Sequence, residues 1–281
     1  MNPTQNQTQN QAIDAFSRLE HAGWQKVVRA YQRSFGGLTI QTVEPLLDAV
    51  GAEPGLKLLD AAAGPGYVAA AAATRGAEVS GLDFSSSMVA AAQQQHPEVK
   101  FRHGNAESLP FESGSFDAVA INFGMLHFAQ PDRALEEACR VLRTGGRVGF
   151  TVWSKPDNAV GFHIILDAIR TCGNINVALP EGPPFFRFSD ARECSDALLK
   201  AGFADARVCE VAQLWRLPSG GALFDAFQTA TVRTAALLNA QTHAALIKIR
   251  AAVEAAAKPY QRVTGEIELP MPAVLASATK I

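Results

Sequence analysis

Apolar positions along this chain change between helical and strand-like spacing several times. Up to Tyr31 the first apolar residues recur near every third or fourth position, which predicts one or two amphipathic helices interrupted at Gly23. A short helix is predicted from about Thr42 to Val50, because Pro45 is tolerated in a first helical turn and Gly51 follows the last one. The chain therefore opens with helices that precede its first strand.

The first strand is predicted at Leu58 to Asp60, an apolar run that ends in a carboxylate. Small residues follow at once, and Gly64 and Gly66 allow the backbone of this turn to approach a ligand closely. A helical pattern starts at Tyr67, so the first free N–H groups of that helix point back toward whatever lies over the turn. The pattern indicates a nucleotide-sized binding site on a strand-turn-helix unit.

Strands and helices then alternate as far as Trp153. This alternation predicts a parallel sheet covered on both faces, with ligands at the carboxyl ends of its strands. The further strands are predicted at 77–83, 99–102, 116–122 and 147–153, and the helices between them at 86–95 and 132–142.

After Trp153 the alternation stops. We expect helices at 161–171, 191–201, 222–238 and 242–257, a loop rich in Pro, Gly and Phe at 179–188, and strands at 207–217 and 269–277. The helical material is interpreted as a lid or substrate-shaping insertion, although a plain packing module has the same pattern. The predicted fold class is α/β, a doubly wound Rossmann-like, mostly parallel seven-stranded sheet with an N-terminal helical cap and a helical insertion in the C-terminal part.

These elements predict one integrated domain with four segments. Residues 1–11 are expected to be a disordered tail, since they are rich in Asn, Gln and Thr and have neither the basic nor the apolar region of a signal peptide. Residues 12–56 form the helical cap, residues 57–153 the ligand-binding core, and residues 154–281 complete the sheet and carry the lid.

Composition narrows the possible partners. Hydrophobic residues make up 48% and charged residues 19% of the chain, and no apolar run reaches the roughly 18 residues of a membrane span. The formal charge of -2 and the lack of a dense basic block argue against binding of nucleic acid. The four cysteines form no C-x-x-C pair, so neither zinc nor a disulfide scaffold is suggested. We expect a cytoplasmic protein without a metal, acting on a small molecule as a monomer or homodimer.

The glycine turn alone does not identify its ligand. Gly64-x-Gly66-x-x-Ala69 also satisfies the dinucleotide fingerprint, with Asp83 at a suitable distance to hold a ribose. However, Asp60 directly before the turn would repel a pyrophosphate, whereas it suits a ligand that carries an ammonium group. This charge argument favours a zwitterion over a diphosphate.

Several stretches between residues 46 and 153 resemble, in order, the class I S-adenosylmethionine-dependent methyltransferases. The similar group contains the small-molecule enzymes of ubiquinone and menaquinone biosynthesis. The matching stretches are Leu58-Leu-Asp-Ala-Ala-Ala-Gly-Pro-Gly66, Val79-x-Gly-Leu-Asp-Phe-Ser-x-x-Met88, Asn105-Ala-Glu107, Phe116-Asp-Ala-Val with Asn122-Phe-Gly-Met-Leu-His127, and Arg140-Val-Leu-Arg-x-Gly-Gly146. One departure is Ala62, where the family usually has glycine.

The resemblance implies roles for individual residues. Asp60 and the turn from Ala62 through Gly64 to Gly66 would hold the methionine end of S-adenosylmethionine. Asp83 would accept both ribose hydroxyls.

The remaining implied contacts concern the adenine and the sulfonium. Phe84 and Met88 would flank the adenine, and Asn105, Ala106 and Glu107 would lie at its amino group. Asn122 and Met125 would line the floor near the sulfonium.

Two kinds of side chain add candidates beyond these motifs. His127 is a candidate general base because imidazole titrates near neutrality, although a lone histidine after a strand is often structural. Trp24, Tyr31 and Trp153 offer ring faces to a sulfonium, although aromatics at helical spacing usually belong to a core.

The predicted function is in-line transfer of methyl from S-adenosylmethionine to an O, N or C atom of a small, largely apolar molecule, with S-adenosylhomocysteine as product. Two alternatives remain at this point: an NAD(P)-dependent oxidoreductase that uses the same glycine turn, and a non-catalytic protein that only binds S-adenosylmethionine.

Overall fold

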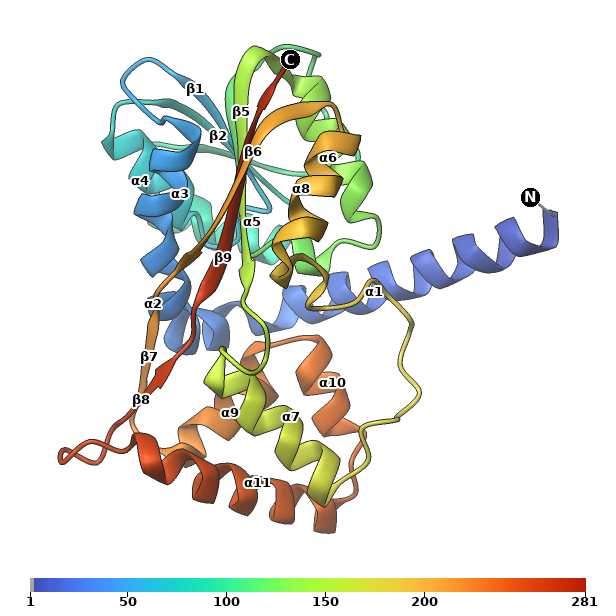
Figure 1. Ribbon diagram of the computed structural model, residues 1–281, viewed down its shortest axis with the longest axis vertical. Helices are drawn as coiled ribbons and strands as arrows, with labels where there is room; N and C mark the ends of the chain where they lie inside the picture. Colours follow the sequence, from blue (N-terminus) through green and yellow to red (C-terminus); the bar gives the residue numbers. More distant parts are fainter. Residues whose placement is uncertain (1–2) are drawn as a thin grey trace.

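The computed structural model describes residues 3–281, and for residues 3–10 and Ala12 it describes the backbone alone. A seven-stranded sheet forms the centre, in the order β3-β2-β1-β4-β5-β9-β6 (Figure 1). Its strands are β1 (Lys57–Ala61), β2 (Glu78–Asp83), β3 (Lys100–His103), β4 (Phe116–Asn122), β5 (Leu142–Trp153), β6 (Phe203–Val211) and β9 (Ala273–Lys280). The first five pair in parallel, while β9 is antiparallel to both β5 and β6. The predicted fold class is therefore confirmed.

Helices cover both faces of the sheet. Leu58 packs with α3 (Val43–Val50) and α4 (Tyr67–Thr74) on one face, whereas its neighbour Leu59 belongs to the core that includes α6 (Pro131–Val141) and α8 (Ala191–Lys200). Successive side chains of a strand point to opposite faces, so a continuous apolar run fills both cores. The figure shows α3 and α4 on one side of the strands and α6 and α8 on the other (Figure 1).

A second group of helices gathers beyond the end of the sheet that carries the carboxyl ends of the parallel strands. It consists of α7 (Val160–Cys172), α9 (Gly220–Ala230), α10 (Arg233–Asn239) and α11 (His243–Ala257), and α1 (Pro3–Ser34) passes between this group and the sheet (Figure 1). The remaining helical elements are α2 (Gly36–Thr39), η1 (Ile40–Thr42), α5 (Ser86–Gln95), η2 (Met125–His127), η3 (Arg187–Ser189) and η4 (Lys258–Tyr260).

The N-terminal helix differs from its prediction in two ways. It already begins at Pro3, where an irregular tail up to residue 11 was predicted, and residues 1–2 of that tail lie outside the described residues. It also continues through Gly23 without a break. A Cβ at Gly23 would lie 2.5 Å from the methyl groups of Val232, so this glycine lets the segment before α10 approach α1 closely.

Three elements predicted in one piece are divided in the structure. The strand predicted at 207–217 becomes β6 and β7 (Leu214–Leu217), and the strand at 269–277 becomes β8 (Ile267–Pro270) and β9; β7 and β8 form a separate two-stranded sheet. Buried Gln213 lies at the break. Its side-chain amide donates to the Leu38 carbonyl, and its backbone carbonyl accepts from the Met271 N–H. The helix predicted at 222–238 is split into α9 and α10.

Phe101 on β3 connects the sheet to the glycine turn. Its ring occupies space that two glycines leave free: a Cβ at Gly81 would lie 2.3 Å from the ring, and a Cβ at Gly66 would lie 2.7 Å from it. Gly66 also has φ +89, a left-handed conformation that favours glycine. The position of the turn over the sheet therefore depends on the absence of two side chains.

In the described part of the chain, every helix is too short or too polar to cross a membrane.

Replacing Gly81 by alanine is expected to lower the free energy of unfolding by about 1–3 kcal/mol, because the added methyl overpacks a buried strand. Gly37→Ala is the matched control, since a Cβ there meets nothing within 4 Å. Urea denaturation of the two variants and the wild type measures the difference. Equal stability of Gly81→Ala and Gly37→Ala would contradict this account of Phe101.

Candidate active site

A large cavity lies at the carboxyl ends of β1, β2 and β4, beneath α1. Its empty volume is about 970 Å³, including the solvent at its mouth. The predicted site residues that line it are Tyr31, Ala62, Gly64, Asp83, Phe84, Met88, Asn122 and His127. The sheet therefore brings together side chains from four separate stretches of sequence.

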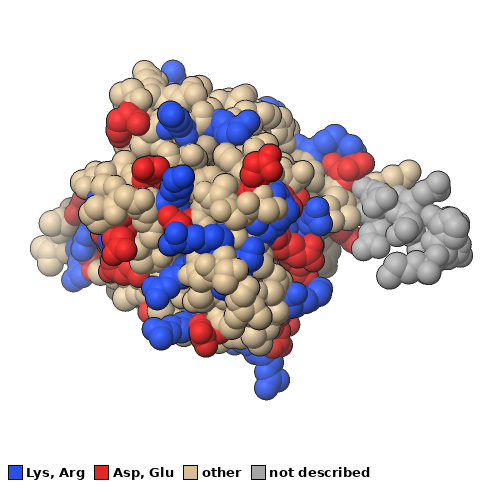
Figure 2. Space-filling model, turned by 90° about the horizontal axis from the view of Figure 1, so that it is seen from above, with Lys and Arg blue, Asp and Glu red and all other residues tan. Residues whose placement is uncertain are grey.

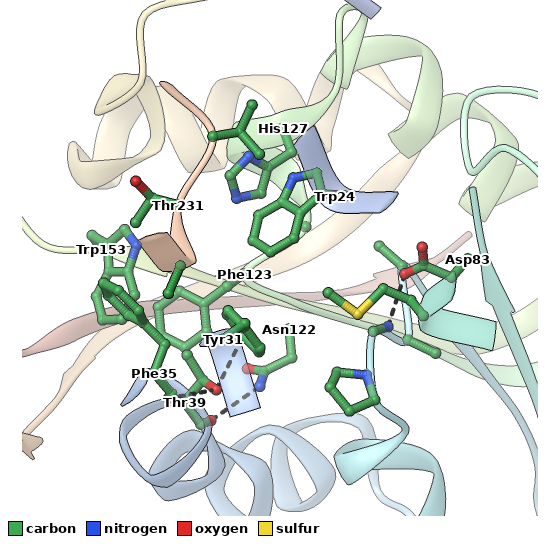
Figure 3. Close-up of a pocket in the computed structure, with 18 of the residues that line it drawn as sticks. Trp24, Tyr31, Phe35, Thr39, Asp83, Asn122, Phe123, His127, Trp153 and Thr231 are labelled. Carbon is green, nitrogen blue, oxygen red and sulfur yellow. Dashed lines mark hydrogen bonds between the residues drawn. The ribbon is translucent and has the colours of Figure 1, made fainter. Parts of the chain in front are cut away.

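Two ends of the cavity differ in chemistry (Figure 3). Asp83 lies at one end, and Trp153, Phe35 and Thr231 lie at the other (Figure 3). Aromatic side chains from several elements dominate the second end: Trp24, Tyr31, Phe35, Phe123, Trp153, Phe162 and Phe185. The polar end suits the charged part of a ligand, and the aromatic end suits an apolar one.

Asp83 ties the tip of β2 to the glycine turn. One carboxylate oxygen accepts from the Gly64 N–H at 2.8 Å and the other accepts from the Ser85 N–H at 2.8 Å. Burial raises the pKa of Asp83 to about 6, although the two backbone N–H groups act in the opposite direction. Each oxygen keeps a free lone pair, so the carboxylate can accept further hydrogen bonds from a ligand.

Asp60, at the tip of β1, lies just below the turn and does not line the cavity. Its side chain is 1% exposed, one oxygen accepts from the Ala69 N–H at 2.9 Å, and the other has no partner among the described residues. Burial raises the pKa of Asp60 to about 7, and the charge of nearby Asp83 adds to the rise. A buried carboxylate with a free oxygen is suited to a cationic group brought by a ligand or a bridging water.

The turn between these carboxylates is held in left-handed conformations at Ala62 (φ 60), Gly64 (φ 53) and Gly66 (φ 89). For Ala62 this conformation is unusual, and it explains why the motif ordinarily has glycine there. Gly124 makes room for it, because a Cβ at Gly124 would lie 2.8 Å from that of Ala62. Gly66 does not line the cavity; it begins α4 as its N-cap residue.

A second, smaller hollow of about 390 Å³ adjoins the cavity and shares Ala62, Phe84, His127 and Phe128 with it. Asn105, Ala106 and Glu107, which were predicted at the adenine, line this hollow and not the main cavity. The Asn105 side-chain oxygen accepts from the Glu107 N–H at 2.9 Å. The three residues are thus held in a local turn at the edge of the site.

Two predicted positions play different parts from those expected. Met125 is 1% exposed in the hydrophobic core and does not line the cavity. Asn122 does line the cavity, but its side chain is engaged by the protein: its amide donates to the Thr39 carbonyl at 3.1 Å and its oxygen accepts from the Thr42 hydroxyl at 2.8 Å. Asn122 therefore links β4 to the helical cap.

Tyr31 is also engaged within the cap. Its hydroxyl and that of Thr39 lie 3.0 Å apart, and burial raises the pKa of Tyr31 well above its usual value. Its ring packs edge to face against that of Trp24 at 5.5 Å between centroids. Both rings face the cavity, so they can contact a ligand without donating a proton to it.

Part of the cavity wall was not among the residues predicted from the sequence. Phe162 on α7 and residues 230–234, from the last residue of α9 to the start of α10, line the cavity, and Glu20 on α1 lies behind His127. The only local signal was the spacing of Glu20 and Trp24, which places them on one face of a helix.

Comparisons with known proteins agree with this arrangement. Residues 59–150 match the family model described as "Methyltransferase domain". The demethylmenaquinone methyltransferase of Beutenbergia cavernae is 44% identical over 110 residues, which cover 39% of this chain and 46% of that protein. The ubiquinone/menaquinone biosynthesis C-methyltransferase UbiE of Rhizobium johnstonii is 38% identical over 138 residues, covering 46% of this chain and 51% of that protein.

The resemblance to class I methyltransferases expected from the motifs is confirmed. The match spans about half the length of these curated relatives.

Solved structures extend the agreement in fold beyond residues 59–150. The YcgJ protein of Bacillus subtilis has a TM-score of 0.54 at 19% identity, covering 85% of this chain and 97% of that one. The phosphoethanolamine N-methyltransferase 2 of Haemonchus contortus, solved with S-adenosylhomocysteine, has a TM-score of 0.54 at 18% identity, covering 90% of this chain and 56% of that one. Residues 59–150 and the elements that follow them therefore share one fold with these proteins.

The buried carboxylate of Asp60 gives a prediction for the protein without ligand. Because the pKa of Asp60 rises from its ordinary 3.8 to about 7 on folding, the folded state binds more protons between these pH values. The contribution of Asp60 to stability is therefore fully present below about pH 4 and is lost as pH rises through about 7.

Asp60→Asn removes this titration, and its amide oxygen can still accept from the Ala69 N–H. We expect the melting temperature of the variant relative to wild type to rise between pH 4.5 and 7.5, with the variant the more stable protein at pH 8. Thermal unfolding followed by circular dichroism measures it. A difference in melting temperature that stays constant with pH would contradict the raised pKa.

Proposed function

We propose that the protein is an S-adenosylmethionine-dependent methyltransferase acting on a small, largely apolar acceptor. The observation that carries this proposal is the pair of buried carboxylates, Asp60 and Asp83, on either side of the left-handed glycine turn at the edge of a large cavity. The names of the curated relatives support transfer of a methyl group, and they favour it over hydride transfer to a nicotinamide.

The residues present fit S-adenosylmethionine. The free oxygen of Asp60 suits the ammonium of the methionine part, directly or through water, and the turn at Gly64 lets the backbone come close to it. Asp83 suits the ribose hydroxyls, because an ionised carboxylate accepts two hydrogen bonds side by side. We assign the adenine to the smaller hollow, between Phe84 and the turn at Asn105.

When bound, S-adenosylmethionine supplies an already activated methyl group on a sulfonium. The protein's part is to orient the donor and acceptor in line and to exclude water from between them. The aromatic end of the cavity, with Trp153 and Phe162, would hold the acceptor. Apolar walls of this kind select flat or aliphatic molecules more than charged ones.

The division of the chain into a cap (12–56), a core (57–153) and a C-terminal part (154–281) gains a functional meaning in this proposal. The core would bind the donor, the C-terminal part would shape the acceptor pocket, and the cap would close both. The cap is joined to the core by Gln25, whose side-chain oxygen accepts from the Ser87 N–H at 3.0 Å.

Several other expectations remain part of the proposal. On the face seen in Figure 2, basic and acidic side chains are interspersed, which supports a small-molecule acceptor over a nucleic acid. Cytoplasmic location, the absence of a metal requirement and a monomeric or homodimeric state are proposed on the composition.

Isothermal titration with S-adenosylhomocysteine tests the proposal directly. We expect saturable binding to the wild type, weakened about 10-fold to 150-fold in Asp83→Ala, because hydrogen bonds to a charged group contribute about 1.5–3 kcal/mol. Asp196→Ala, which changes an exposed aspartate on α8, is the matched control. A wild type that shows no binding would refute the proposal.

Binding is also expected to depend on pH. The pKa of Asp83 is about 6 and that of Asp60 about 7, and both must be ionised to accept from the ligand, so affinity should increase from pH 5 to pH 8. The same titration repeated across this range measures it. Affinity that is independent of pH would show that neither carboxylate receives a hydrogen bond from the ligand.

A further inference from the structure

A buried carboxylate that the proposed cofactor site does not use lies on α1. Glu20 is fully buried, and its Oε2 accepts from the indole N–H of Trp24 at 3.0 Å. The same oxygen lies 2.9 Å from Nδ1 of His127, a residue 107 positions away in the sequence. Glu20 thus joins the helical cap to the segment after β4.

This contact determines which nitrogen of His127 carries its proton. An ionised carboxylate only accepts hydrogen bonds, so the nitrogen facing Glu20 must be the N–H. In the neutral ring Nε2 then keeps its lone pair, ready to accept a proton. The hydrogen bond to Glu20 therefore holds His127 in the Nδ1–H tautomer, whose Nε2 can act as a base.

The His127 ring is placed where such a base is useful. It lines both the main cavity and the smaller hollow, and 18% of its side chain is exposed. Its neighbours are aromatic, with ring centroids at 4.7 Å for Trp24 and 6.3 Å for Phe185. Figure 3 shows the His127 ring beside that of Trp24, between the end of the cavity that holds Asp83 and the end that holds Trp153.

A positive charge balances the buried carboxylate. Arg233 also lines the cavity; its guanidinium lies over the rings of Phe16 and Phe185, and one of its nitrogens donates to the Pro183 carbonyl at 3.0 Å. Burial lowers the pKa of Arg233, and the charge of Glu20 acts in the opposite direction. Arg233 therefore places a positive charge near the pair formed by Glu20 and His127.

We propose that His127 is the general base of the methyl transfer, that Glu20 is its positioning residue, and that the acceptor is a flat ring bearing a hydroxyl group of the phenol or enol type. This inference rests on the proposed function. An amine has a free electron pair and can accept a methyl group before it loses a proton, whereas a neutral hydroxyl is a poor nucleophile until its proton leaves. A histidine that a carboxylate holds in its basic tautomer, with aromatic walls beside it, fits an acceptor with a hydroxyl group.

The step balances as follows for transfer to oxygen. The O–H bond of the acceptor breaks and its proton goes to Nε2 of His127, while the oxygen uses an electron pair to form the new bond to the methyl carbon. The electron pair of the S–CH₃ bond remains on sulfur, which becomes a neutral thioether. The imidazolium is stabilised by Glu20 until it releases its proton to solvent.

The tautomer can be tested without knowing the acceptor. In a protein labelled with ¹⁵N-histidine, NMR of the wild type is expected to show His127 protonated at Nδ1, with its signals assigned by their loss in His127→Ala. In Glu20→Gln the side-chain amide can donate to Nδ1, so we expect a shift toward the Nε2–H form. A wild-type ring protonated at Nε2, or a tautomer unchanged in Glu20→Gln, would overturn the inference.

Binding and turnover complete the test. Affinity for S-adenosylhomocysteine should be unchanged in Glu20→Gln. A wild type that does not bind would refute the proposed function, while loss of binding only in Glu20→Gln would overturn the inference. On a panel of naphthols, hydroquinones and arylamines, we expect turnover of the hydroxyl compounds and a fall in kcat of about 10²-fold to 10⁴-fold in both Glu20→Gln and His127→Ala, with added imidazole restoring His127→Ala.

The matched control is His163→Ala, which changes an exposed histidine that also faces a carboxylate, 3.8 Å from Asp157. It should leave the His127 signals, the binding and the kcat unchanged. Turnover of arylamines alone, or a kcat that is equal in wild type and His127→Ala, would overturn the assignment of the base.

Discussion

The burial of two carboxylates at neighbouring strand tips is the constraint on which the site depends. The parallel register pairs Asp60 with Gly81, so the end of β1 lies beside the end of β2 and its Asp83. Between them the chain has to turn with left-handed residues, and the N–H groups of that turn and of the following helices satisfy part of each carboxylate. One oxygen of Asp60 has no partner among the described residues and is free to accept a hydrogen bond from a ligand. Without such a partner, a buried carboxylate destabilises the folded protein.

The cap contributes to both ends of this site through polar contacts rather than through apolar packing alone. Near Asp83, Gln25 binds the start of α5, and farther along the cavity wall Glu20 binds His127. Thr39 and Thr42, at the far end of the cap, bind Asn122 at the tip of β4. The cap is thereby fixed at three places near the ends of two strands, β2 and β4, so the position of its aromatic rings depends on the whole site.

Small residues decide where segments distant in sequence meet. Gly23 receives Val232, Gly124 receives Ala62, and both Gly66 and Gly81 receive Phe101. Each contact is a close approach that an added Cβ would prevent. Ala62 has a left-handed conformation, which costs roughly 1–3 kcal/mol for a residue with a side chain. The lack of a side chain at Gly124 leaves space for its methyl group. The turn retains its shape because the loop after β4 leaves room for that one methyl group.

Local patterns in the sequence were sufficient to predict the parallel half of the protein and the glycine turn between its first two strands. Strand tips such as Asp60, Asp83 and Asn122 can be placed together from sequence because parallel strands end at the same edge of a sheet. The division of the predicted strands at Gln213, the unbroken course of α1 through Gly23 and the pairing of Glu20 with His127 were decided by tertiary structure. Each depends on a partner distant in the sequence, and a hydrophobic period shows which face of an element is buried but not what it is buried against.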